Sequence, residues 1–271
     1  MDGAKQFSGK TILVTGGAGF IGRATAALLI ERGAAVALTD IRDKKDVAES
    51  LEAELGAAPG KWEYFSGDAT KSEEVAGVVA AVEKWAPSGG IDCLFNNAGI
   101  QGSFAPTDQY DESDFAKVLK VNVESVFLYL KHVSAAMKAR NKPGAIVNTA
   151  SRAGVAGPPN MIAYAASKGA VIALSKTAAK DLAPYKIRVN SISPALVGDC
   201  SMWRNQVEQQ AKVGSQYFPT DPEAAEAQFI KQVPMRRTAS LREVAQCVAF
   251  LLSVEASYIS GDNMSVSGGA V

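Results

Sequence analysis

The feature that most constrains the fold of this chain is a series of short apolar runs separated by segments of helical length. The runs lie at 11–15, 35–39, 62–65, 91–95, 145–150 and 187–193. They are nearly continuous rather than alternating, as expected for strands that are buried on both faces of a parallel sheet. Strands that alternate with helices in this way predict an α/β fold, a doubly wound parallel sheet with right-handed crossovers.

Two of the intervening segments carry a pattern that is typical of helix starts. Thr70 is followed three residues later by Glu73, and Ser240 is followed in the same way by Glu243. In such a capping box the hydroxyl and the carboxylate each accept a hydrogen bond from a backbone N–H of the first turn. We therefore expect helices capped by Thr70 and by Ser240.

The 271 residues contain no internal repeat, linker or low-complexity tract, so we expect a single domain over 1–271. One segment departs from the strand–helix pattern, from Ala195 to about Arg237. A long excursion after the carboxyl end of a strand is where such sheets place a substrate lid, here at about 195–237. A surface insertion or an oligomer contact is the alternative interpretation.

The charge balance excludes several classes of protein. Lys plus Arg equals Asp plus Glu at 28 each, so no net field attracts nucleic acid or an anionic membrane. No apolar run approaches the roughly 18 residues of a membrane-spanning helix. The N-terminus also lacks the apolar core of a secretion signal. These observations predict a cytoplasmic protein.

Cysteine and histidine usage excludes further chemistries. Cys93, Cys200 and Cys247 lie far apart and match no metal-ligand spacing, so the sequence predicts no metal site. We expect Cys93 and Cys247 to be buried and inert, whereas Cys200 could face a ligand. His132 is the single histidine, which excludes a Ser-His-Asp triad and a zinc site built on several histidines.

A glycine-rich turn follows the first apolar run. Gly17, Gly19 and Gly22 fit the pattern G-x-G-x-x-G, between an expected strand and an expected helix. Glycines let a pyrophosphate approach the backbone, and the helix N-terminus provides N–H donors and positive potential. Asp40, at the end of the second run, could accept hydrogen bonds from a ribose diol and would repel a 2′-phosphate. The sequence thus predicts NAD rather than NADP, although Arg42 argues modestly against this preference.

A tyrosine and a lysine are the strongest candidates for proton transfer. Tyr164 and Lys168 are spaced by one helical turn in an alanine-rich segment, so both side chains would lie on one face. A free phenol has a pKa of about 10, but an adjacent ammonium stabilises the phenolate. Ser151 follows the fifth run, and Asn96 to Gly99 follow the fourth. Both segments would lie at the carboxyl edge, where such sheets bind ligands.

Seven short motifs together resemble the short-chain dehydrogenase/reductase family across nearly the whole chain. They are TGGAGFIG (15–22), DAT (68–70), NNAG (96–99), VNV (121–123), NTAS (148–151), YAASK (164–168) and RVNSISPALV (188–197). The resemblance implies a Rossmann-type sheet of seven strands and hydride transfer between a nicotinamide cofactor and a small-molecule alcohol or ketone. It also implies a homotetramer that packs through helices around 113–140 and 163–182.

By the same resemblance, Tyr164 is the general acid/base, Lys168 lowers its pKa and binds the nicotinamide ribose, and Ser151 holds the substrate oxygen. Asn122 would position a water that relays protons, or would hold a strand ending in place. Asp68 would contact adenine, or would cap a helix. The implied cofactor residues are Gly16, Gly19, Phe20, Ile21, Gly22, Asp40, Ile41, Asp68, Ala69, Asn96, Ala98, Gly99, Tyr164, Lys168, Pro194 and Val197.

Two features depart from the family's usual pattern. Phe20 replaces the middle glycine, and the resulting T-G-x-x-G-x-x-G spacing is more typical of the branch that contains nucleotide-sugar epimerases and dehydratases. The chain lacks the large C-terminal substrate domain of that branch, which favours a dehydrogenase. After Pro194 the family commonly has glycine, and then threonine five residues after the proline. Here these positions hold Ala195 and Asp199, and Asp199 either replaces the threonine or turns to solvent.

We expect an NAD-dependent dehydrogenase that acts on a secondary alcohol or its ketone. The alternatives are an epimerase or dehydratase that retains NAD, and a non-catalytic NAD-binding protein. Polar and bulky apolar groups flank the expected site, which would suit a sugar, a polyol or a cyclic alcohol. Arg152 could bind a carboxylate or pair with a lid acid. The candidate substrate residues are Gln101, Arg152, Asn160, Met202 and Trp203.

Overall fold

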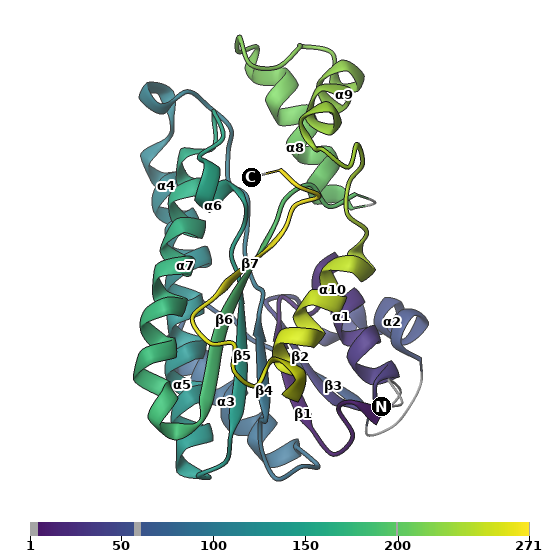
Figure 1. Ribbon diagram of the computed structural model, residues 1–271, viewed down its shortest axis with the longest axis vertical. Coiled ribbons are helices and arrows are strands. Elements are labelled where there is room, and N and C mark those ends of the chain that lie inside the picture. The colour runs from purple at the N-terminus through teal and green to yellow at the C-terminus, as the bar shows by residue number, and fades with distance from the viewer. Residues whose placement is uncertain (1–4, 57–60, 199, 271) are drawn as a thin grey trace.

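The computed structural model describes residues 5–56, 61–198 and 200–270. Its centre is a parallel sheet of seven strands in the order β3-β2-β1-β4-β5-β6-β7 (Figure 1). The strands are β1 (Thr11–Thr15), β2 (Ala35–Asp40), β3 (Trp62–Ser66), β4 (Cys93–Asn96), β5 (Gly144–Thr149), β6 (Ile187–Pro194) and β7 (Asn263–Val266). The doubly wound α/β fold is confirmed, and each of the six apolar runs overlaps a strand.

Helices cover both faces of this sheet. The α-helices of the described chain are α1 (Phe20–Glu31), α2 (Lys44–Leu55), α3 (Ser72–Trp85), α4 (Glu112–Leu119), α5 (Ser125–Ala139), α6 (Ala153–Ala156), α7 (Ile162–Leu182), α8 (Ser201–Val213), α9 (Pro222–Gln232) and α10 (Leu241–Leu252). Helices α1, α2 and α10 pack on one face, and α3, α5 and α7 pack on the other (Figure 1). In the described part of the chain, no helix is both long and apolar enough to cross a membrane.

The strand order reverses between β1 and β4, which are neighbours in the sheet. In open α/β sheets, ligands bind in the crevice beside such a switch point, at the carboxyl ends of the strands. The turn from β1 to α1 therefore lies at the position where the fold itself predicts a site.

Alternate residues of β1 explain why the apolar runs are continuous. Ile12 and Val14 belong to the core that includes α1 and α10, whereas Leu13 belongs to the core that includes α3 and α5. All three side chains are fully buried. Because successive side chains of a strand point to opposite faces, a strand between two helical layers needs apolar residues at every position.

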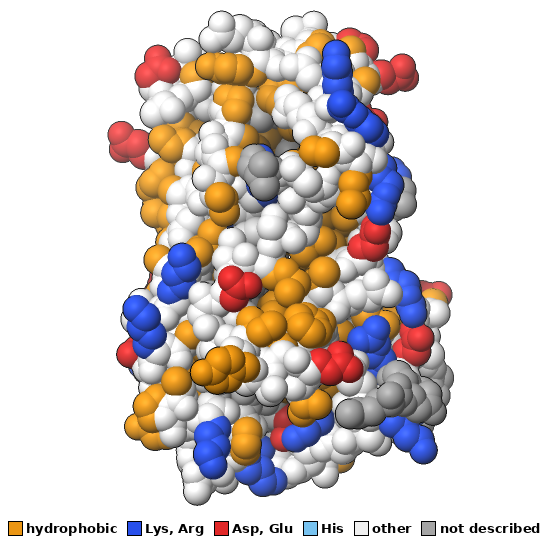
Figure 2. All heavy atoms as spheres, in the orientation of Figure 1, with side chains coloured by type: hydrophobic (Ala, Val, Ile, Leu, Met, Phe, Trp, Pro, Cys, Tyr) orange, Lys and Arg blue, Asp and Glu red, His pale blue; other side chains and the backbone are white. Residues whose placement is uncertain are grey.

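The edge strand β7 lacks such a run. Asn263 Oδ1 accepts hydrogen bonds from Ser191 Oγ at 2.9 Å and from Ser193 Oγ at 2.8 Å, both on the neighbouring strand β6. Polar pairing of this kind gives no hydrophobic signal, so only the family resemblance implied a seventh strand. Figure 2 shows apolar side chains gathered over β7 and α10 on the outer surface.

One of the two expected capping boxes forms and the other does not. Ser240 Oγ accepts from Glu243 N at 3.2 Å, and Glu243 Oε2 accepts from Ser240 N at 2.8 Å, as predicted for the start of α10. The box of Thr70 and Glu73 is wrong, because α3 begins later and the Thr70 hydroxyl donates to Asp68 Oδ1 at 2.8 Å. The short turn at Asp68 competes for the threonine that the pattern assigned to the helix.

Two of the cysteines lie away from the sheet's carboxyl edge. Cys93 is buried in β4, and burial raises the pKa of its thiol to about 12, as expected for an inert cysteine. Cys247 on α10 is only half-buried, less than we expected, because it faces the groove between α10 and β7.

The segment that interrupts the strand–helix pattern contains α8 and α9, which stand above the carboxyl ends of the strands (Figure 1). These helices have an apolar cluster of their own. The Trp203 and Phe229 ring centroids lie 5.3 Å apart, and those of Phe218 and Phe229 lie 4.3 Å apart. The segment is therefore a packed unit, and its role as a lid remains a prediction.

Candidate active site

A cavity of about 640 Å³ lies at the carboxyl edge of the sheet, between the glycine turn and helices α8 and α9. Its volume is within the range of small-molecule and cofactor sites. Most of the implied cofactor residues line it: Gly16, Gly19, Phe20, Ile21, Asp40, Ile41, Asp68, Ala69, Ala98, Gly99, Tyr164, Lys168, Pro194 and Val197. Segments far apart in the sequence thus meet at one site.

The turn between β1 and α1 uses its glycines differently. Gly16 has a φ of +62°, and a Cβ on Gly22 would clash with Gly16 O. Gly22 therefore serves the close packing of α1 on the turn and does not line the cavity. Gly19 precedes α1 and lines the cavity, and among the described residues its added Cβ would meet only Gly16 O, at 3.3 Å. The space at Gly19 and the free N–H groups of the first helical turn fit a pyrophosphate.

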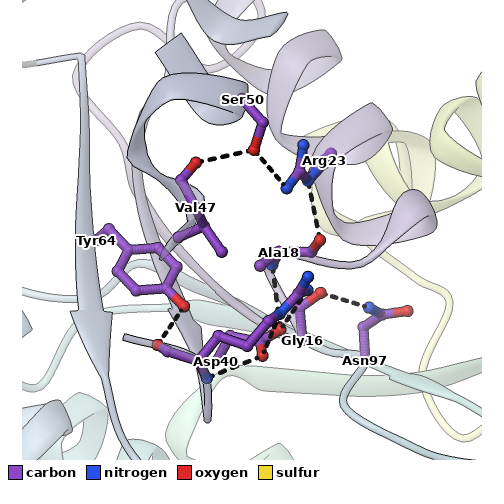
Figure 3. Close-up of polar contacts among 9 residues, drawn as sticks. Gly16, Ala18, Arg23, Asp40, Val47, Ser50, Tyr64 and Asn97 are labelled. Carbon is purple, nitrogen blue, oxygen red and sulfur yellow. Dashed lines mark hydrogen bonds and ion pairs between the residues drawn. The ribbon is translucent and has the colours of Figure 1, made fainter. Parts of the chain in front are cut away.

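Asp40 ends β2 beside this turn (Figure 3). Its Oδ2 accepts from Ala18 N at 3.2 Å, which fixes the carboxylate against the glycine turn. Its Oδ1 accepts from Arg42 Nε at 3.3 Å. The backbone oxygen of Arg42 in turn accepts from the Tyr64 hydroxyl at 2.8 Å. Arg42 is thus turned back onto Asp40, which lines the cavity, and contact of this carboxylate with a ribose stays a prediction.

Asp68 and Ala69 line the cavity beyond β3. Asp68 Oδ1 accepts from Thr70 N at 2.9 Å and from Thr70 Oγ1 at 2.8 Å. Burial acts to raise the pKa of Asp68, but these two hydrogen bonds and the charge of Lys71 outweigh it, and the pKa lies below its ordinary value. The carboxylate closes a turn before α3 and does not cap that helix, whose N-cap is Lys71, while its contact with adenine stays a prediction.

The segment after β4 separates structural from cavity-lining residues. Asn96 is buried, and its Nδ2 donates to Val126 O at 3.0 Å, so its side chain fastens β4 to α5 and does not line the cavity. Ala98 and Gly99 line it. A Cβ on Gly99 would lie 3.3 Å from Lys168 Nζ, which means that the absence of a side chain lets the lysine approach the backbone here.

Ser151, Tyr164 and Lys168 meet where β5 ends against α7. Lys168 Nζ donates to Thr149 O at 2.8 Å and lies 5.7 Å from the centroid of the Tyr164 ring. Ser151 Oγ donates to Pro194 O at 3.5 Å and accepts from Ala153 N at 3.2 Å. Ser151 and Lys168 are 8% and 3% exposed, so both polar groups are largely withdrawn from water while lining the cavity.

Burial controls the proton affinity of the tyrosine and the lysine. It raises the pKa of Tyr164, with the Ser151 hydrogen bond acting in the opposite direction, and it lowers the pKa of Lys168 to about 8. Lys168 Nζ lies on the same side of α7 as the phenol, and its effect on the pKa of Tyr164 stays a prediction. In a site of low polarity, desolvation penalises the charged forms of both groups, the phenolate and the ammonium.

Comparisons with known proteins agree with this geometry. A family model described as enoyl-(acyl carrier protein) reductase matches residues 16–271. Levodione reductase of Leifsonia aquatica is 36% identical over 267 residues, which cover 97% of this chain and 95% of that protein. A 2,5-dichloro-2,5-cyclohexadiene-1,4-diol dehydrogenase of Sphingobium indicum is 38% identical over 265 residues, covering 97% and 98%. The crystal structure of an NAD+-bound xylitol dehydrogenase matches with a TM-score of 0.92 and 51% identity, over 98% of this chain and 100% of that chain.

The chain belongs to the short-chain dehydrogenase/reductase family. It is therefore an oxidoreductase of alcohols and ketones that uses a nicotinamide cofactor.

The asparagine that the family places near its lysine is held by three hydrogen bonds in this short-chain dehydrogenase. Asn122 is fully buried in a π-helical turn, η3 (Lys120–Glu124), between α4 and α5. Its Oδ1 accepts from Ile100 N at 2.8 Å, and its Nδ2 donates to Ile100 O at 2.8 Å and to Ser167 Oγ at 3.0 Å. Asn122 does not line the cavity, and it ties the loop after β4 to α7. This contact agrees with the expectation that it holds a strand ending in place, and the proton relay stays a prediction.

The expected nicotinamide end of this short-chain dehydrogenase lies after β6. Pro194 and Val197 line the cavity there, and Asp199 lies outside the described residues. Cys200 also lines the cavity, as the sequence suggested, and its Sγ contacts Val197 O at 3.3 Å.

The candidate substrate residues divide into two groups. Asn160 does not line the cavity, because its Nδ2 donates to Gln210 Oε1 at 2.8 Å and to Ser215 Oγ at 3.2 Å and fastens the loop before α7 to the lid segment. Arg152 Nε donates to Ala270 O in the segment after β7, and the pairing of Arg152 with a lid acid or a substrate carboxylate stays a prediction. The residues that line the cavity are Gln101, Arg152, Met202 and Trp203.

Sequence reasoning missed the contribution of α8 and α9 beyond their first residues. Gln206, Phe229 and Gln232 also line the cavity. Gln206 could have been found, because it follows Met202 by four residues on a helical segment and therefore lies on the same face.

Proposed function

We propose that this protein catalyses the NAD-dependent oxidation of a secondary hydroxyl group of a polyol or sugar, together with the reverse reduction. The observation that carries the proposal is the grouping of Ser151, Tyr164 and Lys168 on one wall of a cavity. The glycine turn and Asp40 line the other end of the same cavity. A proton-transfer group and a dinucleotide cradle thus share one enclosed space.

The chain's own residues divide the work of the reaction. Tyr164 takes the proton of the alcohol as general base, and Ser151, which acts to lower the pKa of the phenol, holds the substrate oxygen beside it. Lys168, with a pKa of about 8, is able to receive a proton and pass it on. NAD, when bound, accepts the hydride and adds a positive ring that favours the phenolate. Gly19 and the N-terminus of α1 would hold its pyrophosphate, and Asp40 its adenosine ribose.

The preference for NAD over NADP rests on Asp40. Its carboxylate lines the cavity, and the bond from Ala18 N keeps it beside the glycine turn. A 2′-phosphate at this place would meet a negative charge, whereas a 2′-hydroxyl would find an acceptor. Arg42 is occupied by the same carboxylate, which supports NAD further.

The proposal of a polyol or sugar draws on the relatives and on the cavity wall. The xylitol dehydrogenase is 51% identical to this chain, and the diol dehydrogenase also acts on a substrate with more than one hydroxyl group.

A homotetramer stays a prediction from the family, and Phe127, 49% exposed on α5 in the single chain, would suit such a contact.

The test is Tyr164→Phe, assayed by NADH formation with xylitol. We expect turnover to fall by at least about a thousandfold while the affinity for NAD changes little, because the base is lost and the ring is kept. Tyr185→Phe, a half-exposed tyrosine outside the cavity, is the matched control and should leave turnover unchanged. Substantial turnover by the Tyr164→Phe variant would refute the role, and conversion of a sugar without net NADH would favour an epimerase instead.

A further inference from the structure

Two glutamine side chains meet across the cavity, one from the loop after β4 and one from helix α8. Gln101 Nε2 donates to Gln206 Oε1 at 2.9 Å, and Gln101 Oε1 accepts from Asn205 Nδ2 at 3.4 Å. Gln101 is 8% exposed, whereas Gln206 is half-buried. Both line the cavity, so the contact lies inside the site rather than on its outer rim.

The pair lies close to the reacting groups. Gln101 follows Gly99 by two residues, and the position of a Cβ on Gly99 is 3.3 Å from Lys168 Nζ. Two residues of extended chain span at most about 7 Å. A substrate whose oxygen is held by Ser151 and Tyr164 would therefore extend toward Gln101 and Gln206 within a few bonds.

The side chains of Gln101 and Gln206 are uncharged, and they offer both hydrogen-bond donors and acceptors. Each primary amide offers a carbonyl acceptor and an NH2 donor. Within the described residues, Gln206 Nε2 donates to no protein acceptor. The charged group nearest in sequence to Ser151 is Arg152, whose Nε is engaged by the backbone oxygen of Ala270.

A hydroxyl group both donates and accepts, so it can replace either amide partner without leaving a polar atom unpaired. A methylene group cannot, and pressing one against the nearly buried amide of Gln101 would cost a hydrogen bond. A carboxylate only accepts, and it would meet one carbonyl for each NH2. The wall therefore favours a neutral chain with several hydroxyl groups over a plain cyclic alcohol or a hydroxy acid.

We propose that Gln101 and Gln206 form an amide pair that hydrogen-bonds a substrate hydroxyl group remote from the reacting carbon. This pair determines the preference for polyols. The inference rests on the proposed function, because it assigns the specificity of the same site. Removing the amide of Gln206 weakens the binding of polyols selectively and leaves the reaction at the carbinol carbon intact.

The experiment compares xylitol with cyclohexanol, a secondary alcohol that has no second hydroxyl group, as substrates for NADH formation. The variants are Gln206→Leu and Gln101→Leu, which keep the size of the side chain and remove its amide. Gln209→Leu is the matched control, since Gln209 is a half-buried glutamine of the same helix that does not line the cavity. Far-UV circular dichroism and the unfolding midpoint confirm that each variant is folded.

For Gln206→Leu and Gln101→Leu we expect kcat/KM for xylitol to fall by about tenfold, chiefly through KM, while kcat/KM for cyclohexanol stays within about twofold. Gln209→Leu should change neither. Equal losses on both substrates would overturn the inference, because they would mean that the pair only clasps the lid segment to the core. A wild-type protein that oxidises cyclohexanol but no polyol would refute the assignment of a polyol substrate in the proposed function. It would also refute the role of the amide pair in polyol recognition.

Discussion

Replacing Lys168 by methionine should make the protein more stable and at the same time inactive. Lys168 is 3% exposed, and burial lowers its pKa from the ordinary 10.5 to about 8. Its one hydrogen bond to a protein group in the described chain is the bond from Nζ to Thr149 O at 2.8 Å. Methionine has a similar length, fills the same space and carries no charge that must be desolvated.

The size of the effect follows from the lowered pKa. At about 1.4 kcal/mol for each tenfold change in proton affinity, the buried ammonium destabilises the folded chain by about 3 kcal/mol at neutral pH. The lost bond to Thr149 O offsets about 1 kcal/mol of this gain. We therefore expect Lys168→Met to unfold with a free energy about 2 kcal/mol larger than that of the wild type at about pH 7.

The stability difference between the wild type and Lys168→Met should depend on pH in a definite direction. Between the folded pKa of about 8 and the unfolded value of 10.5, the unfolded chain binds more protons at Lys168 than the folded chain does. The stability of the wild type relative to the variant therefore rises with pH in this window. By about pH 9.5 the destabilisation of the folded chain by the buried ammonium falls to about 1.4 kcal/mol. The excess unfolding free energy of Lys168→Met over the wild type should therefore shrink by about 2 kcal/mol.

The assay is urea unfolding of both proteins without added cofactor, followed by circular dichroism at the two pH values. Lys176→Met, an exposed lysine eight residues further along α7, is the matched control and should show neither the gain nor the pH dependence. A variant that is less stable than the wild type at neutral pH, by an amount that does not change with pH, would refute the reasoning. That result would mean that the folded protein solvates this ammonium as well as water does.

Two further predictions concern the frame around the site and the choice of cofactor. A Cβ on Gly154 would lie 2.5 Å from backbone atoms of the catalytic helix α7, so Gly154→Ala should lower kcat by about a hundredfold through displacement of that helix. Gly77→Ala, in open space on α3, should leave kcat unchanged and add about 0.5–1 kcal/mol of stability, and equal kcat values in the two variants would contradict this steric reasoning. Asp40→Ala should lower the ratio of kcat/KM for NAD to that for NADP by about tenfold or more, because it removes an acceptor for the ribose and releases Arg42. Adding Arg42→Ala should then reduce the use of NADP, and an unchanged ratio in Asp40→Ala would show that the carboxylate does not contact the cofactor.

The central strands could be predicted because their requirement is local. Ile12, Leu13 and Val14 each face a helical layer, so burial on both sides is recorded in consecutive residues. The edge strand could not be predicted in this way, because Asn263 is paired with serines of β6 and only one side of the strand needs apolar residues. The capping box at Thr70 failed for a related reason: its hydroxyl has a nearer partner in Asp68 than the helix end provides.

The residues of the candidate site also differ in whether local sequence alone predicts their position. The spacing of Tyr164 and Lys168 fixes their common helix face, and the position of Ser151 after β5 brings it to the same edge. The direction of the Asn96 side chain is not local, because it depends on the approach of α5, whose Val126 O it binds. Contacts such as that of Asn160 with the lid segment join residues about fifty positions apart and leave no mark in a short motif.

The buried lysine connects the stability of the fold with the chemistry of the site. A group that relays protons efficiently needs a pKa near the operating pH, and an ordinary lysine, at 10.5, holds its proton too firmly. Desolvation brings Lys168 to about 8, but the same desolvation raises the pKa of Tyr164 and therefore works against the phenolate. On balance the described protein groups leave the pKa of Tyr164 raised, although Ser151 acts in the opposite direction. We therefore expect the positive charge of the oxidised cofactor to favour the phenolate, so that the tyrosine would act as a base mainly in the complex that is ready to accept the hydride.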